Sequence, residues 1–362
     1  MRNDTRTFLT LIALGLAAGS IGAQAASGLK FNGDFRVRYE YTTEGNSAAS
    51  FGREVGRFRL GMTYALRDDI VVRARLATGD PGDPNSADVT LGSFVNDLAV
   101  SLDIASVEAN RSRWAAFAGK FANPFQSTEL VWDGDVNPQG VAGRVMVGEQ
   151  GGGSVTGTLT GLFFTIDPRT GNQSSNMGGA QVTISSPTRG PWKLAGSAAY
   201  YDYRIGSLAG ADAGDTRSNR LVPGDSAYVS DFNLLDLMVV ADYTGFAERY
   251  PLRVVGDYVH NSGATDLNTG WEADVYFGRG ARQGDLRFRY GYGMTEADAV
   301  LAAFSHDNTT LGTNYEIHTL SVDAVPIASL FLNATLYYYR PHQAALGRKY
   351  QSRLRLNAMV TF

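Results

Sequence analysis

Alternation between apolar and polar residues is the feature that most constrains the fold of this chain. From residue 29 to 41 the odd positions are apolar or aromatic apart from one glycine, and the even positions are all polar. The same period of two recurs over residues 57–66 and, after a short turn, over 70–76. Because successive side chains of a strand point to opposite faces, each segment predicts a β-strand with one apolar and one polar face.

The length of these runs separates two kinds of β-protein. A soluble sandwich also alternates, but its strands are usually about 5 or 6 residues long. The runs in this chain are about 10 residues long, which is the length of a tilted membrane strand. Its 42 glycines, 18 tyrosines and 18 phenylalanines are typical of many strands, tight turns and aromatic girdles. The sequence therefore predicts an all-β, transmembrane antiparallel β-barrel.

A pass along the chain predicts about sixteen strands, joined alternately by short turns and longer outer loops. Barrels of this size keep an aqueous channel. The alternation is weakest at 98–107, at 114–121 and near Ile317. The expected strands are 29–41, 57–66, 70–76, 98–107, 114–121, 139–147, 153–166, 178–186, 192–203, 231–242, 252–260, 271–278, 285–293, 314–324, 329–340 and 349–362.

The first residues predict a secretory signal peptide. Arg2 and Arg6 precede an apolar run at 8–18 and the small-residue sequence Ala23-Gln24-Ala25. We therefore divide the chain into a signal peptide, residues 1–25, and a barrel domain, residues 26–362. Cleavage changes the formal charge from −4 to −5, which argues against nucleic-acid binding. The absence of cysteine excludes a disulfide framework and thiolate metal sites.

The polar face of a barrel strand lines the lumen, so the alternation predicts the pore residues. The first three strands and the last strand contribute many inward-facing arginines. Barrel closure sets the last strand beside the first, which predicts one contiguous basic wall. Its expected members are Arg36, Arg38, Arg57, Arg59, Arg73, Arg75, Arg353 and Arg355.

An acidic group is expected across the lumen from this wall. The third outer loop, 122–138, has apolar residues suited to packing, so we expect it to fold into the lumen. Opposed charges across a narrow wet gap create a transverse field that favours polar solutes. The alternative is that arginines and acids merely form structural ion pairs. The expected acidic residues are Glu129, Asp133, Asp135, Asp236, Asp257, Glu272 and Asp274.

Other motifs indicate no catalytic or metal centre. The segment 79–88, GDPGDPNSAD, has carboxylates spaced for Ca²⁺, but its Asp-Pro and Pro-Gly pairs are ordinary turn chemistry, so a Ca²⁺ site is the minor alternative. The four histidines share no spacing and no nucleophile stands out, so we expect neither a catalytic residue nor a cofactor. Thr295 precedes EADAVLAAF, which predicts a short helix that packs the seventh outer loop.

Two segments resemble the putative porins of Gram-negative outer membranes, which are broadly akin to general and phosphate-selective porins. They are LRDDIVVRARLATGDPGDPNS, residues 66–86, and GKFANPFQSTELVWDGDVNPQGV, residues 119–141. The resemblance implies a sixteen-stranded barrel for passive diffusion, often a homotrimer. It also implies that the terminal Phe362 is an outer-membrane targeting signal read by the barrel assembly machinery. The lumen lacks the dense lysine array expected of a phosphate-specific pore.

The resulting hypothesis is a bacterial outer-membrane channel, exported through the periplasm, for passive diffusion of small hydrophilic solutes and ions. Its apolar belt is expected to contact membrane lipid and lipopolysaccharide, or neighbouring subunits. The competing hypothesis is an outer-membrane barrel enzyme or a receptor-like surface barrel.

Overall fold

The computed structural model describes residues 28–43, 50–83, 85–92, 95, 97–148, 154–169, 173–211, 213–224, 227–343 and 349–362. The predicted signal peptide lies outside these residues. Among the described residues, no helix has the length and apolar character needed to cross a membrane.

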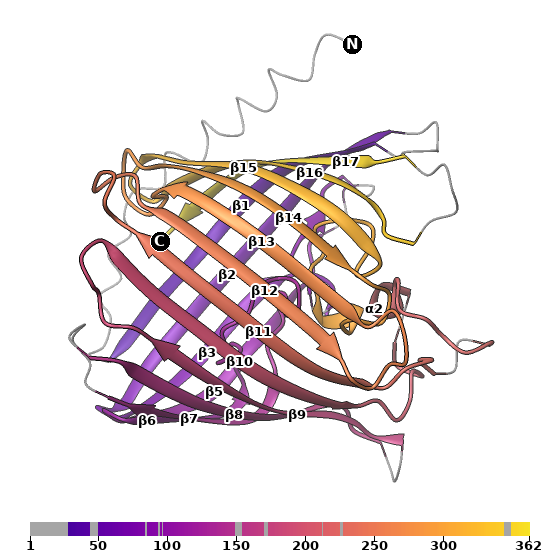
Figure 1. Ribbon diagram of the computed structural model, residues 1–362. Helices are drawn as coiled ribbons and strands as arrows, with labels where there is room; N and C mark the ends of the chain where they lie inside the picture. Colours follow the sequence, from indigo (N-terminus) through magenta and orange to yellow (C-terminus); the bar gives the residue numbers. More distant parts are fainter. Residues whose placement is uncertain are drawn as a thin grey trace.

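The described chain forms one closed antiparallel β-barrel with strongly tilted strands (Figure 1). The sheet has seventeen strands, of which β4 is a two-residue strand in a loop, so sixteen strands make the wall. Each neighbouring pair of wall strands is antiparallel, as expected for hairpins joined in sequence. The strands are β1 (Leu29–Thr43), β2 (Phe51–Arg67), β3 (Ile70–Thr78), β4 (Val89–Thr90), β5 (Val100–Asn110), β6 (Trp114–Lys120), β7 (Gln139–Val147), β8 (Thr156–Asp167), β9 (Ser175–Ser185), β10 (Trp192–Arg204), β11 (Phe232–Tyr243), β12 (Leu252–Asn261), β13 (Thr269–Gly278), β14 (Leu286–Thr295), β15 (Tyr315–Ile327), β16 (Leu330–Pro341) and β17 (Gln351–Thr361).

The sixteen predicted strands are confirmed, including the three weakest, which correspond to β5, β6 and β15. The main difference is at β2, which begins at Phe51 rather than residue 57. Its extra residues pair with the end of β1, with Tyr41 opposite Gly52. The backbone hydrogen bonds between β1 and β2 therefore extend beyond the residues in which apolar and polar side chains alternate clearly.

Barrel closure joins the two ends of the chain. Phe35 on β1 lies opposite Val360 on β17. The last residue extends this pairing, because Gly33 and Phe362 exchange backbone hydrogen bonds of 2.9 and 3.1 Å. Since β1 also pairs with β2, the strands with the predicted arginines are neighbours in the wall.

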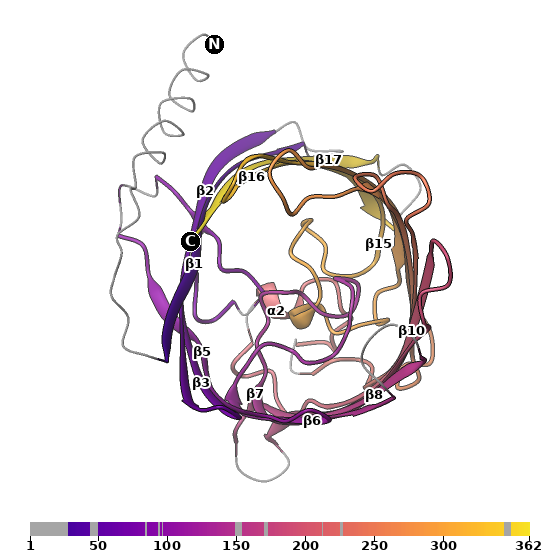
Figure 2. The same ribbon diagram turned by 90° about the vertical axis from the view of Figure 1, so that its left-hand side faces the viewer.

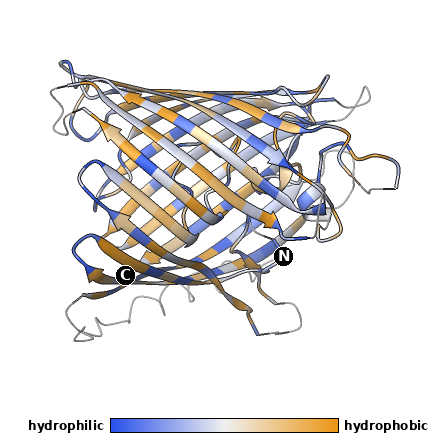
Figure 3. Cartoon of the chain, turned by 90° about the horizontal axis from the view of Figure 1, so that it is seen from below, coloured by the Kyte–Doolittle hydropathy of each residue, from blue (hydrophilic) through white to orange (hydrophobic). Residues whose placement is uncertain are grey.

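The two faces of the wall have opposite chemistry. On β1, Phe31 and Phe35 are about half exposed on the outside, whereas Asp34 and Arg38 are buried on the inside. Hydrophobic and hydrophilic residues alternate along the strands throughout the wall (Figure 3). An exterior rich in exposed apolar side chains suits a lipid environment, because the apolar lipid tails form no hydrogen bonds with the protein surface.

The connections differ strongly between the two ends of the barrel. At the short-turn end they include 68–69, 111–113, 186–191 and 328–329. At the long-loop end they include 121–138, 205–231 and 296–314. The 205–231 loop contains α2 (Ala213–Thr216), and the 296–314 loop contains the 3₁₀ helix η3 (Ala302–Phe304). Instead of the short helix predicted after Thr295, this segment therefore has a single 3₁₀ turn.

The main apolar core lies on the inner side of the wall. It combines side chains of the 121–138 and 296–314 loops with inward-facing residues of β8, β10, β11 and β12. In the view along the barrel, coil from these loops lies within the ring of strands (Figure 2). A barrel of this width has room for such segments beside an aqueous path.

Candidate functional site: a charged channel interior

The arginines of the first and last strands lie on neighbouring strands of the wall. Arg36 on β1 is opposite Arg57 on β2. On the other side of β1, Arg355 of β17 is opposite Glu40. Arg38 and Arg355 are both buried on the inner face. Arg73 and Arg75 lie nearer the short-turn end, opposite Thr63 and Gly61.

Each of the eight predicted arginines has a carboxylate partner. Arg36 and Arg38 share Asp88, and the Arg38 contact is 2.5 Å. Arg57 and Arg59 share Asp34 at 2.9 and 2.8 Å. The remaining pairs are Arg73 with Glu108 at 2.9 Å, Arg75 with Asp103 at 2.5 Å, Arg353 with Glu40 at 3.7 Å and Arg355 with Glu40 at 2.8 Å.

The sequence analysis did not identify the acids that pair with the basic wall, which lie partly on a strand and partly in loops. Asp34 and Glu40 occupy even positions of the first alternating run, beside Arg36 and Arg38, so the signal was present there. Asp88 and Asp307 belong to loops, where no periodicity indicates which way a side chain points. The wall is therefore a set of arginines that are paired with carboxylates, several of them shared, rather than a run of uncompensated cations.

The 121–138 loop contacts three separate parts of the wall through hydrogen bonds. The Thr128 hydroxyl donates to Asp257 on β12 at 2.5 Å. The backbone N–H of Gln126 donates to the side chain of Gln181 on β9 at 2.7 Å. At the other end of the loop, Asp135 accepts a 3.0 Å hydrogen bond from Arg59 on β2. These contacts tie the loop to opposite sides of the interior.

Apolar residues anchor the same loop. The ring of Phe125 meets Tyr201 edge-on, with centroids 5.4 Å apart. Trp132 meets Phe164 on β8 edge-on at 5.7 Å and stacks on Phe304 at 5.5 Å. Buried rings of this kind contribute both apolar burial and specific contact geometry. The apolar residues that are unusual for a surface loop thus pack inside the barrel.

The 296–314 loop is a second segment that contacts the interior, and the sequence analysis did not predict its location. Arg355 donates to the side chain of Asn308 at 2.8 Å, and Tyr337 on β16 donates to the same oxygen at 3.0 Å. The amide nitrogen of Asn308 then donates to Glu129 at 2.5 Å. Asn308 therefore links the basic wall to the 121–138 loop.

The predicted acidic residues fall into two groups. Glu129, Glu272 and Asp274 line the large internal cavity, together with Asp242. The others are not part of its lining: Asp135 pairs with Arg59, Asp257 accepts a hydrogen bond from Thr128, and Asp133 and Asp236 are buried. The structure thus brings only part of the predicted acidic set to the cavity surface.

The pKa values of two loop acids, Asp133 and Asp307, are shifted in opposite directions. Burial raises the pKa of Asp133 well above its usual value, and the nearby carboxylates Glu129 and Asp307 raise it further. For Asp307, burial alone opposes ionisation, but Arg355 and Arg38 outweigh it and lower the pKa to about 2. Asp307 is thus a charged partner of the basic wall, whereas Asp133 is favoured in its neutral form.

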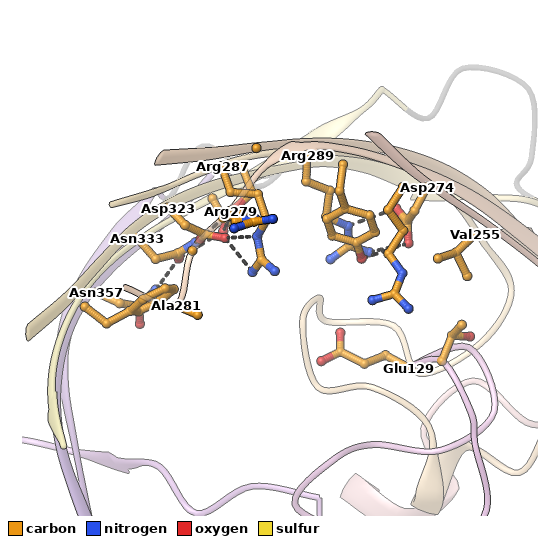
Figure 4. Close-up of a pocket in the computed structure, with 18 of the residues that line it drawn as sticks. Glu129, Val255, Asp274, Arg279, Ala281, Arg287, Arg289, Asp323, Asn333 and Asn357 are labelled. Carbon is orange, nitrogen blue, oxygen red and sulfur yellow. Dashed lines mark hydrogen bonds and ion pairs between the residues drawn. The ribbon is translucent and has the colours of Figure 1, made fainter. Parts of the chain in front are cut away.

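A cavity of about 1290 Å³ lies between these charged elements. Arg36, Arg38, Arg57 and Arg355 line one part of it, and Glu129 lines another. Figure 4 shows a further part, where Arg289 pairs with Asp274 at 2.9 Å and Arg287 pairs with Asp323 at 2.6 Å. The sequence analysis missed these two arginines, although they alternate with Phe288 and Tyr290 in the strand they share.

The structure also shows where the other sequence motifs lie. No group of three or more His, Cys, Asp or Glu side chains there is arranged to hold a metal ion. In the 79–88 segment, Asp80 accepts a 2.9 Å bond from the backbone of Gly82, and Asp88 pairs with the basic wall. Among the histidines, His306 is buried, while His342 contacts Glu316 at 3.0 Å. Burial lowers the pKa of His306 to about 3.

Comparison with known families gives a match to a family described as putative porins, over residues 41–211. This segment includes strands β2–β10 and the 121–138 loop. Comparison with curated protein sequences gives no match.

Solved porin structures have the same fold. OprB of Pseudomonas putida, in its high-pH structure, is similar with a TM-score of 0.61 at 14% identity, over 92% of this chain and 94% of that chain. An anion-selective porin from Comamonas acidovorans has a TM-score of 0.54 at 11% identity, over 92% and 99% of the two chains. A loop-deletion mutant of OmpT from Vibrio cholerae gives the same four values. The chain is thus similar to putative porins over residues 41–211 and shares the barrel fold of the solved structures over 92% of its length.

Proposed function

We propose that the protein is a passive outer-membrane channel for small hydrophilic solutes and ions, with no turnover chemistry. The observation that carries this proposal is the large internal cavity, which has the arginine pairs on one side and Glu129 on another. Its lining is rich in charged and amide groups, which favour polar solutes over apolar ones. The constriction lies between the basic wall and the two inner loops, 121–138 and 296–314.

The charge arrangement supports a transverse field at this constriction. Arg36 and Arg38 share one carboxylate, so that pair retains a net positive charge on the wall. Glu129 has its carboxylate on the cavity side of the facing loop and is bridged by Asn308. A polar solute that aligns its dipole with this field regains part of the energy that it loses on leaving bulk water, whereas an apolar solute gains nothing from the field.

Several features of the cellular setting belong to the same proposal. Residues 1–25 direct export to the periplasm, and the carboxyl-terminal Phe362 helps the barrel assembly machinery recognise the chain. The apolar exterior contacts lipid, lipopolysaccharide and two further copies of the chain in a homotrimer. The trimer form of OmpT from Vibrio cholerae, whose fold is similar, supports the last point.

Single-channel recording and liposome swelling test the proposal. The purified full-length mature chain is expected to give stable conductance steps in planar bilayers. Sugars of increasing size are expected to enter liposomes at steadily decreasing rates. An occluded barrel, such as an enzyme or a receptor-like surface protein, gives neither result, so silence in both assays contradicts the proposal.

A further inference from the structure

A second cavity, of about 370 Å³, lies at the long-loop end of the barrel, apart from the charged cavity described above. It is bounded by the ends of β6, β7, β8 and β9 and by segments of the 121–138, 205–231 and 296–314 loops. Its size falls within the range of roughly 300–1,000 Å³ that is common for small-molecule sites.

One wall of this cavity is apolar and firmly held. Phe164 and Phe304 meet edge-on with ring centroids 5.7 Å apart, and Trp132 contacts both rings from behind. Ile166 and Ile205 continue this wall and remain partly exposed. A preformed apolar surface of this kind accepts a flat or aliphatic body with little reorganisation.

The polar side of the cavity contains an unusual cation. Lys120, the last residue of β6, donates to the backbone carbonyl of Asn137 at 2.9 Å. The carboxylate of Asp103 is already engaged, because it accepts 2.5 Å and 2.7 Å bonds from Arg75 and Asn137. Among the ion pairs of the described residues, none includes Lys120, whereas every arginine of the basic wall has a carboxylate partner.

This ammonium group has capacity for a ligand. A lysine side chain carries three N–H donors, and the described contacts of Lys120 use one of them. The acids that line the same cavity already interact within the protein: Asp167 pairs with Arg169 at 2.5 Å, and Asp215 has its own internal contact. The cavity thus combines an apolar wall with a cation that forms no ion pair with a carboxylate of the described residues.

We propose that this cavity binds a small aromatic carboxylate, with the ring against Phe164 and Phe304 and the carboxylate at Lys120. A carboxylate supplies the anionic acceptor that Lys120 lacks in the described chain, and a ring covers the partly exposed Ile166 and Ile205 beside the two phenylalanines. The inference rests on the proposed function, since binding at this long-loop end is read out as a reduced ion current through the channel.

Ion-current block in planar bilayers tests this site with three probes. Benzoate has both the ring and the carboxylate, acetate lacks the ring, and benzyl alcohol lacks the charge. We expect benzoate to reduce the current at lower concentration than either of the other two. Equal block by benzoate and acetate overturns the role of the apolar wall, and equal block by benzoate and benzyl alcohol overturns the role of Lys120.

Two variants with a matched control locate the site. Lys120→Met keeps the apolar stem of the side chain and is expected to weaken benzoate block about tenfold, since a hydrogen bond to a charged group is lost. Ile205→Asn makes the wall polar and is expected to weaken benzoate block while leaving the response to acetate unchanged. Lys193→Met, at the short-turn end, serves as the control and is expected to behave as the wild type.

The results separate failure of this site from failure of the channel. Conductance without any probe reports whether the barrel forms a channel at all. If all variants conduct and benzoate blocks Lys120→Met as strongly as the wild type, the binding site is wrong while the proposed function stands. If no variant conducts, direct binding of benzoate to the detergent-solubilised wild type, measured by calorimetry, still decides the site, and absence of binding overturns it.

Discussion

Trp132 and Phe304 stack with their ring centroids 5.5 Å apart and their planes 19° from parallel. They belong to the two loops that contact the barrel interior, 121–138 and 296–314. The backbone N–H of Asp133 also donates to the carbonyl of Phe304 at 2.7 Å. This contact therefore couples two loops that reach the interior from different strands.

Trp132→Ala is expected to loosen both loops. Removing a buried Trp side chain costs about 3–5 kcal/mol of local stability. We expect noisier single-channel currents and faster entry of larger sugars into liposomes, with unchanged strand content by circular dichroism. Trp192→Ala is the control, because Trp192 is half exposed on the outside near the short-turn end. Identical currents in the Trp132→Ala variant and the wild type contradict the coupling.

Asn308→Ala is expected to widen the constriction. This change removes the acceptor used by Arg355 and Tyr337 and the donor to Glu129, so the link between wall and loop is lost. Single-channel conductance is expected to rise. Asn268→Ala, in another long-end loop, removes a 3.0 Å bond to a backbone carbonyl and is expected to leave conductance unchanged. Equal conductance in both variants excludes Asn308 from the constriction.

Asp88→Asn is expected to make the channel more permeable to anions. Asp88 is the shared partner of Arg36 and Arg38, so its neutralisation adds one net positive charge beside the cavity. At low salt, the ratio of anion to cation permeability is expected to rise by a factor on the order of ten. Reversal potentials across a salt gradient measure this ratio. Asp266→Asn is the control, because the side chain of Asp266 is largely exposed, and a similar shift in both variants refutes a local effect.

The 121–138 loop is expected to be less firmly held as the pH rises. The pKa of Asp133 is raised in the folded loop. Its contribution to the stability of the loop is therefore full at low pH and is lost as the pH rises above 3.8, the pKa of the unfolded aspartate. Ionisation sets a new negative charge beside Glu129, Asp135 and Asp307. Current noise is expected to increase with pH, and Asp133→Asn is expected to suppress that increase.

Asp80→Asn controls for a general effect of removing a carboxylate, because Asp80 is exposed in a turn. It is expected to retain the pH dependence of the wild type. A pH response that survives in Asp133→Asn assigns the titration to another group. Asp307 has the opposite pH dependence. Because its pKa is lowered, its contribution to the stability of the folded loop is present above 3.8 and is lost as the pH falls through about 2.

Strand positions and the inner face of each strand were predictable from the sequence. The alternation at Arg36 and Arg38, or at Arg57 and Arg59, is a local property, because the pleat sends successive side chains to opposite faces. Closure then follows from the number and length of the strands. The position of Phe362 opposite Gly33 is part of the same register.

The contacts between loops could not be predicted in this way. Asn308 and Glu129 are 179 residues apart in the chain, and nothing near either residue indicates the other. The pairing of Asp88 with Arg36 spans 52 residues, and Asp88 lies in the connection between β3 and β5, where no alternation indicates its partner. Loop conformations are selected by the surfaces they meet, so their contacts appear only when the wall is complete.

The sequence by itself thus determined the barrel, its inward arginines and the apolar character of the 121–138 loop, because these are properties of local pattern. Only the tertiary structure decided which acids neutralise the arginines, that the 296–314 loop contacts the interior, and that Lys120 lacks a carboxylate partner in the described chain. These features arise from side chains brought together across large sequence separations, where electrostatic and packing energies depend on distances that no local period encodes.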